Sequence, residues 1–71
     1  MKDWSDSFIA RVERAVLLAT HGRVGKLHVE HSGDVVVLHG RCPSLSCKML
    51  AGDAALLLIG EAKLENKIEI H

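Results

Sequence analysis

The sequence predicts an α+β fold, a two-layer sandwich in which two helices cover one face of a three-stranded mixed sheet. Apolar residues recur every three or four positions in two segments and alternate with polar residues in three others, in the order α-β-β-α-β. A sheet with one apolar face buries that face against another layer, and here only the helices can form it. With 71 residues, the chain is expected to be a single domain over residues 1–71.

Composition narrows the function classes. Apolar residues make up 48% of the chain, which excludes a disordered polypeptide. Nine basic residues balance nine acidic ones, so no basic stripe for phosphate contacts is expected, and no nucleic-acid partner. The N-terminus lacks the pattern of a secretory signal, and the longest apolar run, residues 54–59, is too short to span a bilayer. A cytoplasmic protein is therefore expected.

The first helix is expected over residues 5–20. Ser5 is a favourable N-cap, and Trp4 is placed to pack against Ile9 as a hydrophobic staple. Gly22 is placed to end the helix in a left-handed conformation. One apolar stripe is formed by Phe8, Val12, Ala15, Val16 and Ala19.

A hairpin follows, because apolar and polar residues alternate on both sides of a turn signal at residues 32–33. We predict a two-residue loop at these positions. The resulting pairs are His31 with Asp34, Val29 with Val36, and Leu27 with Leu38. This register keeps the apolar side chains on one face of the sheet.

The second helix is expected to begin after Ser44 or Ser46 and to end at Gly60, because Pro43 stops the preceding strand. A single final strand should then cover residues 62–71. Its inward face would carry Asn66 among apolar residues, namely Ala62, Leu64, Ile68 and Ile70. The helical crossover makes the second and third strands parallel, in the sheet order 1-2-3.

Two stretches of this pattern resemble the BON domain, a module named for bacterial osmotic-shock and nodulation proteins. One is residues 32–44, with Gly33, alternating valine and leucine, Gly40 and a serine that opens the helix; the other is Gly60 followed by Leu64, Asn66, Ile68 and Ile70. Cys42 and Glu61 depart from the family, which usually has valine at both places. The resemblance implies a non-catalytic binding unit that contacts phospholipid surfaces or partner domains.

Two of these motif residues have structural interpretations. Gly40 indicates a bulge or the close approach of another backbone, which we expect to be the crossing helix. Asn66 on an inward face needs hydrogen bonds, and we expect it to bond backbone near Gly60 or the end of the second helix; ligand contact is the alternative. Cys42 and Cys47 are expected to be buried thiols rather than a disulfide.

Metal and catalytic interpretations are weaker. His28 and His39 should face outward on neighbouring strands, but no cluster with zinc-site spacing is visible, so solvated histidines and no metal or cofactor are expected. No serine–histidine–acid order or pair of buried carboxylates predicts an enzyme. Residues 22–25 resemble the glycine loop of RNA-binding KH domains, but they join a helix to a strand.

The second helix is apolar on two faces. One consists of Cys47, Leu50, Ala51, Ala54, Leu57 and Leu58, and the other of Leu45, Met49, Gly52, Leu56 and Ile59. If the first face covers the sheet, the second is covered by the first helix, by a partner, or by lipid, although only Lys48 supplies a flanking cation. The leading hypothesis is protein–protein or self-association through the second face. The alternative is a phospholipid-surface or small-ligand module.

Overall fold

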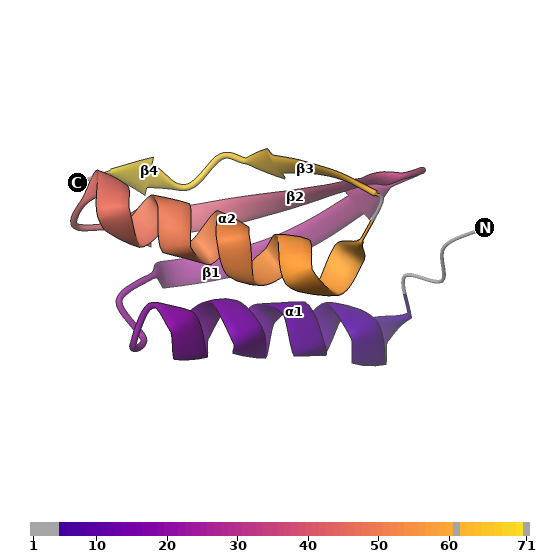
Figure 1. Cartoon of the computed structure of the whole chain (residues 1–71), viewed down its shortest axis with the longest axis horizontal. Coiled ribbons are helices and arrows are strands. Elements are labelled where there is room, and N and C mark those ends of the chain that lie inside the picture. The colour runs from indigo at the N-terminus through magenta and orange to yellow at the C-terminus, as the bar shows by residue number, and fades with distance from the viewer. Residues whose placement is uncertain (1–4, 61, 71) are drawn as a thin grey trace.

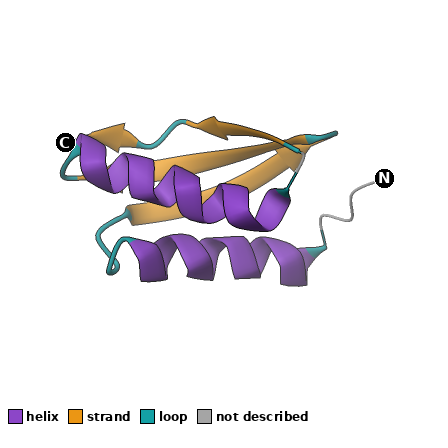
Figure 2. Ribbon diagram, viewed as in Figure 1, coloured by secondary structure: helices purple, strands orange, loops and turns teal. Residues whose placement is uncertain are grey.

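The computed structural model describes residues 5–60 and 62–70. Its elements are α1 (Asp6–Ala19), β1 (Gly25–Ser32), β2 (Val35–Cys42), α2 (Leu45–Ile59), β3 (Lys63–Asn66) and β4 (Glu69–Ile70). The two helices lie side by side on one face of a mixed sheet, and no other described element covers the opposite face (Figure 1, Figure 2). The predicted α+β fold is confirmed. The predictions for Trp4, Glu61 and His71 lie outside the described residues.

Both ends of α1 follow from local chemistry. The Ser5 hydroxyl accepts a hydrogen bond from the Phe8 N–H at 3.2 Å, which satisfies one free donor of the first turn. Beyond the C-cap Thr20 the backbone becomes left-handed at His21, at φ +54°, and stays so at Gly22, at φ +72°, which donates its N–H to Leu17 O at 2.8 Å. The predicted N-cap and the predicted stop glycine are confirmed.

The ends of α2 are formed in the same way. Ser44 is the N-cap, and its hydroxyl accepts the Cys47 N–H at 3.2 Å. Gly60 ends the helix at φ +63° and donates its N–H to Leu56 O at 3.2 Å. Of the two serines that the sequence offered, Ser44 is therefore the cap.

The predicted register of the hairpin is wrong by two residues. The loop is Gly33–Asp34 rather than residues 32–33, and Val29 lies opposite Leu38. The left-handed conformation falls on Gly33, at φ +57°, so Ser32 stays extended and pairs with Val35. A shift of two residues exchanges partners and keeps every side chain on its face, so the predicted apolar face survives. It also places His28 directly opposite His39.

Gly40 lies where two strands come closest. A Cβ at this position would be 2.8 Å from Val24 Cγ1 and 2.9 Å from Gly25 O, and the backbone has φ +155°. The predicted close approach is confirmed, but the approaching backbone is the start of β1, not a helix. The β1–β2 register shifts between Gly25 and His28, and this irregularity in the ladder is next to the point of contact.

The predicted final strand is interrupted. β3 and β4 both run parallel to β2, as expected, and β1-β2-β3 is the expected order. Between β3 and β4, the Lys67 N–H still donates to Leu38 O at 2.9 Å, but the Ile68 N–H donates to Asn66 Oδ1 at 3.2 Å. The Asn66 side chain thus accepts a hydrogen bond from a backbone N–H, and the ladder of backbone hydrogen bonds is interrupted at this point.

The core lies between the helices and the sheet. It consists of Val12, Val16, Val24, Val29, Val36, Leu38, Cys42, Cys47, Ala51, Ala55, Ile59 and Ile68. Every element except β3 and the short β4 contributes a buried apolar residue to this cluster, and Ile68 lies between those two strands in the sequence.

Candidate functional site

The face of α2 that packs on the sheet differs from the predicted one. Its buried residues are Cys47, Ala51, Gly52, Ala55 and Ile59. Small side chains at positions 51, 52 and 55 let the helix lie close to the elements packed against it, so the buried arc falls between the two predicted apolar faces. Gly52 and Ile59 therefore belong to the core, and the prediction that they form part of an exposed surface is wrong. The larger leucines lie on the two flanks of this arc.

Leu45, Met49 and Leu56 form one exposed flank, the α2 strip. Their exposed fractions are 59%, 60% and 45%. Spacings of four and seven place the three side chains within about 40° of one another around the helix axis. The opposite flank carries Leu50, Leu57 and Leu58, of which Leu57 is 87% exposed. Although α1 packs beside α2, it leaves both flanks open.

Asn66 connects β3 to α2. Its Nδ2 donates to Lys48 O at 2.8 Å, and its Oδ1 accepts the Ile68 N–H at 3.2 Å. The expected bond to α2 backbone is present, but it reaches the first half of the helix rather than its end near Gly60. Both polar atoms of this half-buried amide have partners within the fold, so its role here is structural.

Cys42 and Cys47 are free, buried thiols, as predicted. The Cys42 thiol donates to Ser44 O at 3.3 Å. Burial raises the pKa of the Cys47 thiol above 9.0, and the neighbouring Cys42 thiol raises it further, against the opposing charge of Arg23. A thiol held in its protonated form is a poor nucleophile, so Cys47 has the character of a core residue rather than of a reactive centre.

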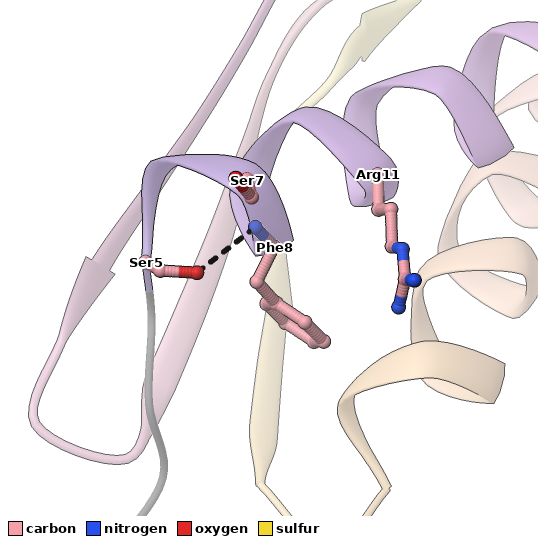
Figure 3. Close-up of a pocket in the computed structure, with 4 residues that line it drawn as sticks. All are labelled: Ser5, Ser7, Phe8 and Arg11. Atoms are coloured by element: carbon pink, nitrogen blue, oxygen red, sulfur yellow. Dashed lines mark hydrogen bonds between the residues drawn. The ribbon is translucent and has the colours of Figure 1, made fainter.

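Among the hollows lined by described residues are two open ones. One, of about 300 Å³, lies at the N-terminal turn of α1, where Phe8 and Arg11 extend from the same side of the helix (Figure 3). The Ser5 hydroxyl there is already used as the helix cap. The other, of about 390 Å³, is lined by Arg23, Gly25, Arg41, Cys42 and Pro43. Neither hollow contains a carboxylate beside a nucleophile.

The uncovered face of the sheet carries a polar cluster. His28 and His39 face outward, as predicted, and Glu30 lies between them. Glu30 Oε1 is 3.0 Å from His39 Nε2 and 3.5 Å from His28 Nε2. The predicted hairpin register placed His28 opposite Val37 instead of His39, so the direct pairing of the two histidines was not expected.

Within residues 5–60 and 62–70, no three or more histidine, cysteine or acidic side chains are grouped so as to hold a metal ion. Over the same residues, no buried side-chain nitrogen or oxygen lacks a hydrogen-bond partner. None of the helices in the described part of the chain has the length and apolar character needed to cross a membrane. The feature of these residues that most needs an explanation is the exposed apolar surface of α2.

Comparison of the chain with models of protein families, with curated proteins and with solved structures finds no match in any of the three.

Proposed function

We propose that this chain is a BON-like, non-catalytic interaction module that associates with a protein partner or with a second copy of itself through the α2 strip. One observation carries the proposal: the strip holds three large apolar side chains in one row, each more than two-fifths exposed. Burying such side chains contributes roughly 1.5–3 kcal/mol each when the contact is complete. A polar side chain at these positions would be equally compatible with the fold.

The composition of the strip suits a contact surface. Met49 is unbranched and adapts its shape to a partner, while Leu45 and Leu56 are stiffer anchors on either side of it. Charged neighbours are sparse, since only Lys48 and Asp53 carry charge in the whole of α2. An interface centre depleted in charge and rich in such side chains is typical of protein–protein contacts. Lipid insertion calls for several flanking cations, which this helix lacks.

The test is the molar mass in solution over a concentration series, measured by sedimentation for the parent chain and for Leu56→Glu. The parent should pass from monomer to dimer, and Leu56→Glu should remain monomeric because a carboxylate in the contact is desolvated without a partner. Far-UV circular dichroism should be the same for both proteins. If the parent is a monomer at every concentration, self-association is excluded and a different protein is the remaining candidate partner. Capture experiments that compare the parent with Leu56→Glu then test whether such a partner binds the strip.

Two matched variants make the test specific. Leu57→Glu places the same charge on the opposite flank of α2, and Leu18→Glu places it on α1, where the leucine is 66% exposed. Both should associate as the parent does. Equal loss of association in all three variants would show a general effect of added charge and would remove the case for the strip. Binding of the parent to anionic vesicles, without association in solution, would favour the lipid alternative.

A further inference from the structure

His28 and His39 form a cross-strand pair and point away from the core, since their neighbours Val29 and Leu38 are buried. Their ring centroids are 6.0 Å apart, and the ring planes are inclined at 34°. The Nε2 atoms of both rings lie within 3.5 Å of the same oxygen, Glu30 Oε1. Two imidazole nitrogens and one carboxylate oxygen are thus held at one point of the solvent-facing surface by the register of the hairpin.

We propose that His28 and His39 chelate one divalent transition-metal ion of the nickel, copper and zinc class, with the charge of Glu30 beside it. Imidazole nitrogen suits these ions, whereas magnesium and calcium prefer oxygen. Directly opposite residues of an antiparallel pair have Cβ atoms about 4.5–5.5 Å apart, so two imidazoles can close on a single ion with small side-chain rotations. Once the first imidazole binds, the second binds as an intramolecular ligand at high effective concentration.

The surroundings of the pair favour a cation. Among the described residues, the ion-pair contacts of Glu30 are to these two imidazoles only, so no lysine or arginine neutralises its charge. The side chains of His28 and His39 are 64% and 38% exposed, which leaves them free to turn without disturbing the core. Because no group of three or more histidine, cysteine or acidic side chains among the described residues is arranged to hold a metal ion, the protein supplies only the two imidazoles, and water fills the remaining coordination positions. The site is therefore open and exchangeable.

The test is a calorimetric titration of the reduced protein with Ni²⁺, chosen because it does not oxidise the two thiols. We expect one ion per chain in the parent. His28→Ala and His39→Ala should each weaken binding by more than about tenfold, since each leaves a single imidazole. The double variant should bind no more weakly than either single variant, because removing one ligand already destroys the chelate. Mg²⁺ should not bind measurably.

The matched control is His21→Asn, which removes an imidazole from the α1–β1 loop. Asparagine tolerates the left-handed backbone found there, at φ +54°, and nickel binding should be unchanged. If His39→Ala destabilises the sheet, His39→Gln is the alternative variant. The unfolding midpoint of His39→Ala without metal shows whether the sheet is destabilised.

Three outcomes would overturn the site: unchanged binding in both single variants, equal loss in His21→Asn, or additive losses that indicate independent histidines. Leu56→Glu, on the opposite face, should bind nickel as the parent does, so failure of the association proposal leaves this one standing.

Discussion

Asn66 Nδ2 lies 2.9 Å from the point at which a side chain on Gly52 would begin. The amide occupies this space because it donates to Lys48 O, one turn earlier in α2, at 2.8 Å. A glycine in the middle of a helix normally costs about 1 kcal/mol relative to alanine. Here it lets β3 reach the helix backbone, so Gly52 and Asn66 act as one structural unit rather than as contacts for a partner.

Gly52→Ala should lower the free energy of unfolding by up to about 2 kcal/mol. Better helix propensity gains about 1 kcal/mol, but displacing Asn66 leaves a half-buried amide and its backbone partner unpaired, at a cost of about 1–3 kcal/mol. Urea unfolding followed by circular dichroism measures the difference.

The control reverses the sign of this effect. In an Asn66→Ala background the obstructing amide is gone, so Gly52→Ala should then stabilise the protein by up to about 1 kcal/mol. The same sign in both backgrounds would contradict the coupling of the two residues. Gly25→Ala, where the nearest atom to a new Cβ is Arg41 O at 4.0 Å, should be close to neutral.

Gly40→Ala should be more damaging than Gly52→Ala. The new Cβ would meet Gly25 O at 2.9 Å, and backbone cannot move aside as the end of a side chain can. Its φ of +155° adds strain of about 1–3 kcal/mol, so the total loss should exceed about 2 kcal/mol.

Gly33→Ala separates the cost of the steric clash from the cost of backbone strain. Gly33 also has a left-handed backbone, at φ +57°, but no atom lies within 4 Å of an added Cβ. Its substitution should therefore cost only the backbone term of about 1–2 kcal/mol. Equal losses at both glycines, measured by urea unfolding, would mean that the clash of an added Cβ at Gly40 with Gly25 O adds nothing to the cost of the substitution.

The hairpin shows what hydrophobic periodicity can and cannot predict. Alternation assigns each residue to a face, and the inward face assigned to Val29, Val36 and Leu38 is confirmed, because an even shift of register preserves it. Alternation does not choose between loops at residues 32–33 and 33–34. That choice depends on which residue takes the positive φ, and Gly33 takes it as the first loop residue. The pairing of His28 with His39 therefore had no signal in the hydrophobic pattern.

The second helix shows a different limit. When apolar residues surround a helix, no hydrophobic direction selects the buried side, and volume decides instead. Ala51 and Ala55 lie on the buried side because a large side chain there would hold the helix away from the rest of the core. Counting small residues along the helix could have found this face, and with it the buried position of Gly52. The interruption between β3 and β4 depends on one hydrogen bond, from the Ile68 N–H to the Asn66 side chain, which hydrophobic alternation does not predict.

Cys47 predicts a loss of stability at alkaline pH. Burial, with help from Cys42, raises the pKa of its thiol above 9.0 in the folded protein. Above the unfolded pKa, the unfolded chain has released this proton while the folded chain still holds it, so unfolding becomes more favourable as pH rises. The stabilisation is therefore complete below about pH 8 and decreases above it, by no more than about 1.4 kcal/mol per pH unit.

The measurement is urea unfolding of the reduced protein at several values between about pH 7 and pH 10, compared with Cys47→Ala. Lysine titration affects both proteins alike, so the difference between their curves isolates the thiol. The alanine variant, which creates a small cavity, should be less stable at neutral pH, and its deficit should shrink as pH rises. A deficit that stays constant over this range would mean that Cys47 ionises as readily in the folded chain as in the unfolded one, which its burial against Cys42 argues against.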